Sequence, residues 1–277
     1  EAQPVSHAPP GRPQAKSEVE ATACDDVNDL CSFWANSGEC EKNPGYMIVE
    51  CAKSCKTCHL RDPKVRCVSE PNDAPALEEG KLDDMFERAT GPEWASLKPS
   101  VYSTDPWIVV FDEFLSAQEV SDLLEVYSTR TLERSSNVGR MNALGRYEPS
   151  IDKTRTSENA WCDGACADLE PVRRVSQRIG NLTNVSETQS EFLQLLRYEP
   201  GQYYRTHHDF IPSHLEFPFG PRLYTLFLYL TDVEEGGETS FPQLGIAVKP
   251  KAGRALLWPS VRNTSNTHAD YRTTHEA

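Results

Sequence analysis

Residues 195–209 read LLRYEPGQYYRTHHD, and this stretch places two metal-capable side chains, His207 and Asp209, one residue apart. The run before them favours a β-strand, and alternate residues of a strand point to the same face of a sheet. We therefore expect the imidazole of His207 and the carboxylate of Asp209 to project side by side, about 6 to 7 Å apart at Cα. A second imidazole would complete the facial triad that holds non-haem Fe(II) and leaves coordination positions open.

Two histidines downstream are candidates for the third ligand, His268 and His275. A strand near the C-terminus would bring either of them back beside the first pair. Read alone, a His-x-Asp dipeptide is common by chance, so spacing does not separate a metal site from an ordinary surface pair. By strand alternation, His208 is expected to face away from the metal, on the surface or behind the ligands.

The composition bounds the class of protein. With 277 residues, 38% of them apolar, the chain is long enough for one larger and one smaller domain. Its formal net charge of −14 argues against a nucleic-acid or anionic-membrane surface and fits solubility better than a basic partner. No run of about 18 apolar residues is present, so we expect no membrane span. Because the first residue is Glu1, we expect a signal peptide or anchor ahead of it to be missing from this sequence.

The cysteines are concentrated near the N-terminus, where six of the nine lie in residues 24–58. This density is typical of a disulfide-stapled module made in an oxidising compartment. A zinc site at Cys55-x-x-Cys58 is disfavoured because no second CxxC pair follows it. Spacing alone does not choose among the many possible pairings. The same secretory compartment is indicated by three candidate N-glycosylation acceptors, Asn181, Asn184 and Asn263.

The six cysteines have the order and spacing C-x6-C-x8-C-x10-C-x3-C-x2-C, with Trp34, Gly38, Asn43 and Tyr46-Met47 between them. This pattern resembles the ShKT (sea-anemone-toxin-like) module. The resemblance implies three disulfides, Cys24–Cys58, Cys31–Cys51 and Cys40–Cys55. In multidomain proteins such modules usually serve as recognition appendages.

The segments that flank the module differ in composition. Residues 1–23 are rich in Pro, Ala and charge and predict a disordered tether. Residues 59–100 contain five prolines and predict a linker with one short helix over residues 81–89. Cys67 lies in this linker without an evident partner. From residue 101 to residue 277 the pattern is that of a globular domain.

Within residues 101–277, WIVVF at 107–111 predicts a strand, and Ser116 with Glu119 predicts the capping box of the helix that follows. We expect this helix to cover the core with Val120, Leu123, Leu124 and Tyr127. Residues 169–182 predict a second covering helix, which carries Val172, Val175 and Ile179 at helical spacing.

Residues 132–158 are polar and Arg-rich, and they predict a long mobile loop. Residues 222–230 are apolar on both faces, which predicts a central strand of a closed or two-layered sheet. Cys162 and Cys166 lie four residues apart, and a local disulfide between them is as plausible as two free thiols.

Four ordered motifs then resemble the prolyl 4-hydroxylase branch of the Fe(II)/2-oxoglutarate dioxygenases. They are Tyr198-x-x-Gly201-Gln202-x-Tyr204-x-x-His207-x-Asp209, Arg222-x-x-Thr225-x-x-x-Tyr229-Leu230, Gly236-Gly237-Glu238-Thr239-x-Phe241-Pro242 and Asp270-x-Arg272-x-x-His275-Glu276-Ala277. Matches at residues 105–116 and 155–157 extend the resemblance over residues 101–277. It implies an α+β class: a double-stranded β-helix (jelly-roll) catalytic domain flanked by helices, plus the small disulfide-rich ShKT module.

The resemblance also implies roles for single residues. It selects His275 over His268, so His207, Asp209 and His275 would ligate Fe(II). Tyr198 and Thr225 would line the pocket of the cosubstrate 2-oxoglutarate, and Arg155 would lie near the substrate groove. The implied reaction is procollagen-proline 4-dioxygenase-like. It is a 4-hydroxylation of peptidyl proline in secretory-pathway proteins of the endoplasmic reticulum or Golgi, and it uses 2-oxoglutarate, O₂ and L-ascorbate.

In that family a lysine beyond the last histidine pairs with the distal carboxylate of 2-oxoglutarate, whereas this sequence ends at Ala277. We therefore expect a dioxygenase domain that is incomplete at its C-terminus, binds iron weakly and turns over poorly, with Arg222 and Arg254 as candidate substitute anchors. Two alternatives stay open. One is a non-catalytic or impaired binding protein that uses the ShKT module, and the other is a sibling oxygenase that acts on another residue, such as lysine.

Overall fold

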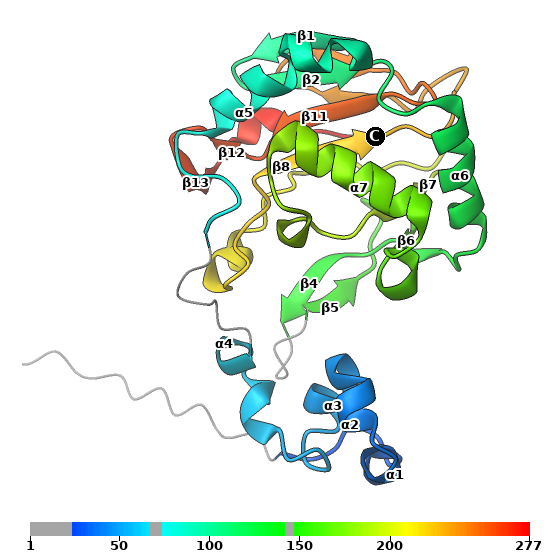
Figure 1. Cartoon of the computed structure of the whole chain (residues 1–277), viewed down its shortest axis with the longest axis vertical. Coiled ribbons are helices and arrows are strands. Elements are labelled where there is room, and N and C mark those ends of the chain that lie inside the picture. Colours follow the sequence, from blue (N-terminus) through cyan, green and yellow to red (C-terminus); the bar gives the residue numbers. More distant parts are fainter. Residues whose placement is uncertain (1–23, 67–73, 142–146) are drawn as a thin grey trace, which may run out of the picture. The chain divides into compact units, whose positions relative to one another are not determined.

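The computed structural model describes residues 24–66, 74–141 and 147–277, which form two compact units (Figure 1). The first unit holds residues 24–66, and the second holds the other described residues. The predicted tether at residues 1–23 and the linker cysteine Cys67 lie outside the described residues. Among the helices of the described part, none has the length and apolar character needed to cross a membrane.

Three short helices make most of the first unit: α1 (Cys31–Asn36), α2 (Glu39–Lys42) and α3 (Pro44–Glu50). Helices of this length are not stable alone in water. Three disulfides hold them, and their pairs are those that the ShKT resemblance implies: Cys24–Cys58, Cys31–Cys51 and Cys40–Cys55. One buried cluster consists of Cys31, Met47 and Cys51, and Val49 and Ala52 are also buried. The unit ends with η1 (Cys58–Arg61) and α4 (Pro63–Arg66).

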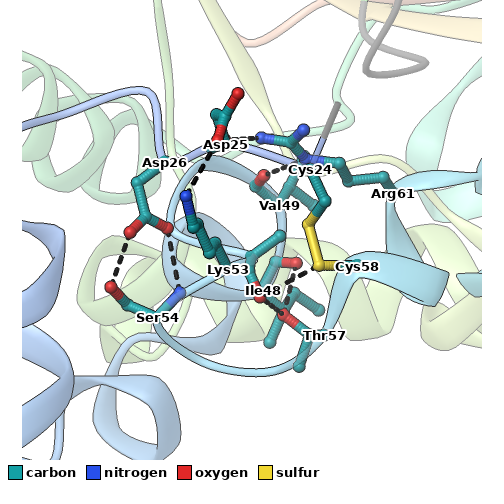
Figure 2. Close-up of a disulfide and its surroundings, with 11 residues drawn as sticks. Cys24, Asp25, Asp26, Ile48, Val49, Lys53, Ser54, Thr57, Cys58 and Arg61 are labelled. Atoms are coloured by element: carbon teal, nitrogen blue, oxygen red, sulfur yellow. Dashed lines mark hydrogen bonds and ion pairs between the residues drawn. A yellow bond between two sulfur atoms is a disulfide. The ribbon is translucent and has the colours of Figure 1, made fainter. Parts of the chain in front are cut away.

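The Cys24–Cys58 disulfide fastens the first described residue to the end of the module (Figure 2). Beside it, the carboxylate of Asp26 accepts hydrogen bonds from the backbone N–H (3.0 Å) and the hydroxyl (2.6 Å) of Ser54. Arg61 donates from Nε to a backbone carbonyl of α3 at 3.2 Å. The bond from Arg61 satisfies a carbonyl in the last turn of α3, which the short helix leaves unpaired.

A four-stranded antiparallel sheet forms the centre of the second unit, in the order β1 (Pro99–Thr104), β2 (Trp107–Phe111), β11 (Ala255–Pro259) and β8 (Tyr224–Leu228). Every residue of β2 and β11 is buried, as expected for two inner strands. Successive side chains alternate between two hydrophobic clusters: Val109, Phe111 and Leu257 belong to one, and Val110 and Trp258 to the other.

Helices cover the face of the sheet that carries the first cluster (Figure 1). They are α5 (Leu82–Ala89), α6 (Ala117–Ser128) and α7 (Glu170–Thr183), close to the expected ranges. The capping box of α6 is present, because Ser116 and Glu119 exchange backbone and side-chain hydrogen bonds. One expectation for α6 is wrong: Leu124 is 36% exposed, and Val126 is buried instead. The buried stripe follows steps of three residues, and Leu124 lies beyond its edge.

The predicted central strand, β8, in fact lies at the edge of the four-stranded sheet, where its partner is β11. Both of its faces are nevertheless covered. Leu226 and Leu228 pack against the helix-side cluster, and Phe227 packs against the other one. The apolar residues on both faces therefore reflect the burial of both faces. They do not indicate whether the strand lies at the edge or in the middle of the sheet.

The prediction of a long loop at residues 132–158 is wrong. This segment contains β3 (Glu133–Arg134), β4 (Asn137–Met141), β5 (Tyr147–Ser150) and the start of β6 (Glu158–Trp161). Strands β4 and β5 pair antiparallel, and β6 lies between β3 and β7 (Gln194–Arg197). Backbone pairing makes these strands without the alternation of apolar side chains that sequence patterns detect. A Cβ at Gly139 would lie 2.4 Å from the carbonyl oxygen of Glu148, so this pairing requires glycine there.

The cysteines of the second unit form a disulfide, Cys162–Cys166, which settles the alternative that their spacing left open. Both residues are buried, and the bond joins the end of β6 to η3 (Gly164–Cys166) just before α7. The other elements are short strand pairs and 3₁₀ turns: β9 (Thr239–Phe241) with β10 (Ile246–Val248), β12 (Val261–Arg262) with β13 (Ser265–Ala269), η2 (Pro92–Leu97), η4 (Glu187–Gln189), η5 (Pro212–Glu216) and η6 (Tyr271–Thr273).

Candidate metal centre

Three metal-capable side chains come together in the second unit: His207, Asp209 and His275, whose ligand atoms all lie within 4.8 Å of one another. The backbone brings the distant histidine into place. His207 N–H donates to the carbonyl of His275 (2.8 Å), and His275 N–H donates back to the carbonyl of His207 (2.9 Å). The exposed His268 lies outside this group and hydrogen-bonds Ser265.

The route to this position differs from the predicted strand. Strand β7 ends at Arg197, and the pairing at His207 is an isolated bridge. Between them the chain turns: Gln202 N–H donates to the carbonyl of Glu199 at 2.9 Å, and Gly201 takes a φ of +83°. A left-handed residue of this kind is compatible with a turn and not with a continuous strand.

Both imidazoles are oriented by backbone carbonyls. Nδ1 of His207 lies 2.9 Å from the carbonyl of Arg205, and Nδ1 of His275 lies 3.0 Å from the carbonyl of Thr273. A carbonyl can only accept, so each Nδ1 carries the proton and each Nε2 keeps a free lone pair. Those nitrogens lie 3.9 Å (His207) and 3.8 Å (His275) from the carboxylate oxygens of Asp209. This is the tautomer that metal-bound histidines adopt when a partner fixes the other nitrogen.

The carboxylate of Asp209 is held from the other side. Thr225, on β8, donates from its hydroxyl to Oδ2 of Asp209 at 2.6 Å. Burial opposes ionisation, but the two imidazoles, this hydroxyl and the charge of Arg222 outweigh it and hold the pKa of Asp209 below its usual range. Arg222 itself pairs through Nε and Nη2 with Glu191 (2.5 and 2.8 Å). The carboxylate is therefore ionised at neutral pH.

Asp209 must be charged to bind a metal, whereas His207 must be neutral, because only a neutral imidazole can bind a metal. Burial, followed by repulsion from His275, lowers the pKa of His207 to about 3, although Asp209 acts against the shift. The ring is therefore neutral at physiological pH. The donor set of two imidazole nitrogens and one carboxylate oxygen on one face suits Fe(II) and leaves positions open, so the residues present fit that ion.

An aromatic wall backs the third ligand. The rings of Trp258 and Phe241 lie 4.8 and 5.7 Å from the ring of His275, centroid to centroid. Both residues belong to the second hydrophobic cluster and are almost fully buried, with 2% and 0% of their surface exposed. They exclude water from one side of the centre.

The first ligand is backed by Tyr204, which the motif contains but to which the sequence assigns no role. Its ring stacks on His207 with centroids 3.5 Å apart and planes 16° apart. The hydroxyl of Tyr204 donates to Asn137 of β4 at 3.1 Å, and the guanidinium of Arg155 lies 4.5 Å from its ring. Sequence reasoning missed this stack because strand alternation places residues three apart on opposite faces, whereas the chain here is not a continuous strand.

The predicted cosubstrate and substrate residues have different positions. Thr225 directly contacts the candidate ligand Asp209. Arg155 is 9% exposed, and its Nη1 lies 3.4 Å from the carbonyl of Ser136. Tyr198 is half-buried, and its burial raises the pKa of its hydroxyl despite the nearby charge of Arg155. These three residues stay predictions for the binding of small molecules or substrate.

Other polar residues near the centre have structural partners. His208 points away from it: Nε2 lies 3.0 Å from the carbonyl of Asp270, and Nδ1 accepts from the N–H of Phe210. Arg254 is paired with Asp112 at 2.6 Å, which disfavours it as a substitute cosubstrate anchor. Arg222 and Glu191 form a matched ion pair whose field reaches Asp209, a connection that no sequence motif indicated.

Comparison with known protein families agrees with this geometry. Residues 193–277 match the 2OG-Fe(II) oxygenase superfamily, and residues 23–58 match the family described as ShK domain-like. The first match spans both candidate histidines, the carboxylate and Thr225. The second spans all six cysteines of the first unit.

Similar proteins of known name are prolyl 4-hydroxylases. The chain is 33% identical to prolyl 4-hydroxylase subunit alpha-2 of Caenorhabditis elegans over 189 residues, which cover 66% of this chain and 33% of that protein. It is 32% identical to prolyl 4-hydroxylase 1 of Arabidopsis thaliana over 180 residues, 60% of this chain and 62% of the relative. The chain thus spans between a third and two thirds of these relatives.

Among solved structures, the chain is similar to the viral collagen prolyl hydroxylase vCPH from Paramecium Bursaria Chlorella virus-1 in its 2OG complex. The identity is 26%, the match covers 61% of this chain and 86% of the viral one, and the TM-score is 0.42. From its family matches and relatives, the chain carries a 2OG-Fe(II) oxygenase domain, related to prolyl 4-hydroxylases, and a ShK-like disulfide module at its N-terminal end.

Proposed function

We propose that the chain is an Fe(II)- and 2-oxoglutarate-dependent dioxygenase that hydroxylates C4 of peptidyl proline in proteins of the secretory pathway. One observation carries the proposal: two imidazoles, both with Nε2 free, and one ionised carboxylate converge on a single point. The names of the relatives favour proline over lysine as the residue modified.

In this proposal His207, Asp209 and His275 hold the iron. Bound Fe(II), with 2-oxoglutarate and O₂, supplies the oxidant, and the overall reaction yields succinate, CO₂ and one hydroxyl group on the proline. The residues of the chain hold and shield the ion. Thr225 keeps the carboxylate oriented and ionised, and the wall of Trp258 and Phe241 limits access of water.

We assign Tyr198 and Thr225 to the side of the centre that receives 2-oxoglutarate, and Arg155 to the side of the peptide. The hydroxyl of Thr225 donates a hydrogen bond to Asp209, so Thr225 would contact the cosubstrate through its methyl group. Arg155 acts through the ring of Tyr204, over which its guanidinium lies. The polymeric partner is a proline-rich polypeptide, and O₂ is the second substrate.

The disulfides indicate the compartment. A three-disulfide module requires an oxidising environment, for which we propose the lumen of the endoplasmic reticulum or Golgi. L-Ascorbate would keep the iron reduced. Asn181 and Asn184 are exposed and stay candidate glycosylation sites, whereas the half-buried Asn263 uses its side chain to cap α5.

The proposal is tested by incubating the chain with Fe(II), ascorbate, 2-oxoglutarate and either a proline-rich or a lysine-containing peptide. We expect the mass of one oxygen atom to be added to proline, with succinate released in equal amount. Asp209→Ala should abolish both products, and His268→Ala should leave them unchanged. Calorimetry of Fe(II) binding under argon gives a readout that does not depend on turnover.

Three outcomes would contradict the proposal. Oxygen added to lysine alone would identify a sibling oxygenase. Iron binding without oxidation of either peptide would favour a binding protein. Iron binding that survives Asp209→Ala would show that the iron is not held by His207, Asp209 and His275.

A further inference from the structure

The first unit contains an open cavity of about 570 Å³, built by the three short helices. Its lining includes Phe33 and Trp34 of α1, Glu39 of α2, and Tyr46 of α3, together with Asn43 between α2 and α3. The volume lies within the range of ligand pockets. The oxygenase centre lies in the other unit, so that centre does not explain the cavity.

Aromatic rings dominate this cavity. Trp34 and Tyr46 meet edge to face, with centroids 6.1 Å apart and planes 80° apart. Phe33 leaves 65% of its surface exposed, although it is a large apolar side chain. Rings packed edge to face in this way are in contact with each other and form a rigid aromatic surface. Together with Phe33 these rings form one apolar patch, and a contiguous exposed apolar patch is typical of an interaction site.

Three hydrogen-bond donors of the cavity lining are free within the described residues, whereas the hydroxyl of Ser37 donates to the carbonyl of Phe33 at 3.0 Å. In that part of the chain, the indole N–H of Trp34, the hydroxyl of Tyr46 and the side-chain amide of Asn43 have no hydrogen-bond partner. All three can donate, so they suit a ligand that presents acceptors. A polypeptide in the polyproline II conformation is such a ligand, because it has no internal hydrogen bonds and its carbonyls are free.

The charge of the cavity narrows the class of ligand further. Glu39 is the charged side chain of the lining. Its neighbour Lys42 lies 3.8 Å away and donates instead to the carbonyl of Ser37 at 3.1 Å. Glu39 is thus weakly compensated, which favours a ligand with a basic residue and disfavours an acidic one.

We propose that this cavity binds a polyproline II segment, rich in proline and carrying a basic residue, of the polypeptide that the second unit hydroxylates. Aromatic-lined grooves with free donors recognise such segments in several unrelated domains. The prolyl rings lie against the aromatic side chains of the lining, the free donors bind backbone carbonyls, and Glu39 pairs with the basic side chain. The identity of the peptide as substrate rests on the proposed function, whereas the binding chemistry does not.

This assignment gives the ShK-like module a purpose within one enzyme. A chain with two sites for one repetitive polymer holds the substrate after each release and raises its effective concentration at the oxygenase. Such a gain matters most for polymers with many prolines, since each encounter then serves several turnovers.

The test is a titration of the full chain into a fluorescein-labelled peptide of about ten residues, mostly proline with one arginine, followed by anisotropy. Phe33→Ala should weaken binding about tenfold, because it removes a large apolar contact. Tyr46→Phe should weaken it less, since it removes only one hydrogen bond. Leu30→Ala is the matched control: this residue is also exposed, at 53%, but lies outside the cavity lining, so its Kd should not change.

Glu39→Gln separates charge from shape. It should weaken binding of the arginine peptide about two- to fivefold and leave an all-proline peptide unaffected. His207→Ala should preserve binding to the cavity, because it alters only the metal centre. If hydroxylation is absent but Phe33→Ala still weakens binding, the proposed function fails and the docking site stands.

Two results would overturn the inference. One is an unchanged Kd in Phe33→Ala and Tyr46→Phe in a chain that binds the peptide. The other concerns the chain's own proline-rich stretch, which includes Pro9, Pro10 and Pro13 with Arg12. If added peptide binds only after these prolines are replaced by alanine, the cavity belongs to that segment and not to the substrate.

Discussion

The hydroxyl of Thr225 donates a 2.6 Å hydrogen bond to Oδ2 of Asp209, and this bond joins the edge strand β8 to the candidate metal centre. The two residues are separated by a loop that contains η5, so β8 positions a ligand that it does not itself carry. Thr225 shares the sheet face of Phe227, opposite the helices, because alternate residues of a strand face the same way. The placement of Asp209 therefore depends on the packing of β8.

Thr225→Val removes this hydrogen bond while keeping the shape of the side chain. A hydrogen bond to a charged group contributes about 1.5 to 3 kcal/mol, so the pKa of Asp209 should rise and Fe(II) should bind about 10- to 100-fold more weakly. Calorimetry of Fe(II) binding as a function of pH measures both effects. Thr225→Ser restores the hydroxyl and should recover most of the affinity. Equal affinities in the valine and serine variants would show that the bond has no role in metal binding.

The stability of the metal-free protein should fall on mild acidification. In the folded chain the pKa of His207 is about 3, below its ordinary value of 6.5. Between these values the unfolded chain takes up a proton that the folded chain does not, so acid favours unfolding. Stability is complete above pH 6.5 and is lost as the pH falls towards 3. A change from about pH 7.5 to about pH 5.5 should cost about 1.4 kcal/mol through this residue.

Urea unfolding at the two pH values, with wild type and His207→Gln compared, measures this contribution. Glutamine does not titrate, so the variant should lose about 1.4 kcal/mol less than wild type over the same interval. Histidines that do not contact His207 titrate alike in both proteins and cancel in the comparison. An identical pH dependence in the two proteins would mean that His207 is not buried as neutral imidazole.

The disulfide between Cys162 and Cys166 should stabilise the second unit despite its short loop. Chain entropy predicts a contribution of about 2 kcal/mol for a loop of this size. Both residues are buried, at 0% and 4% exposure, and the bond links β6 to the residues that precede α7. The double variant Cys162→Ala/Cys166→Ala should therefore unfold at lower urea concentration with unchanged cooperativity. A midpoint equal to that of wild type would assign the bond no stabilising role.

The sequence identifies parts of this site that depend on residue type and order. Residue type and motif order identify His207, Asp209 and His275 as candidate ligands. Apolar periodicity predicts the helices. Position within the sheet is harder to predict, because β8 is apolar on both faces for reasons of packing. Strands β4 and β5 are short and contain Gly139 and Pro149, residues that weaken a strand prediction. The stack of Tyr204 on His207 and the pair of Arg222 with Glu191 depend on how loops close, and local pattern does not encode that closure.

A last contact of this kind links the two ends of the second unit. Helix α5 begins without a capping side chain of its own, and Oδ1 of Asn263 accepts from the N–H groups of Leu82 (3.0 Å) and Asp83 (3.1 Å) instead. Asn263→Ala leaves these donors unpaired and should cost about 1 kcal/mol of unfolding free energy. Asn263→Asp keeps the acceptor oxygens, places a negative charge at the N-terminus of the helix and should retain full stability. Both variants remove the glycosylation acceptor. An equal loss of unfolding free energy in both variants would therefore show that the effect comes from a glycan and not from the cap.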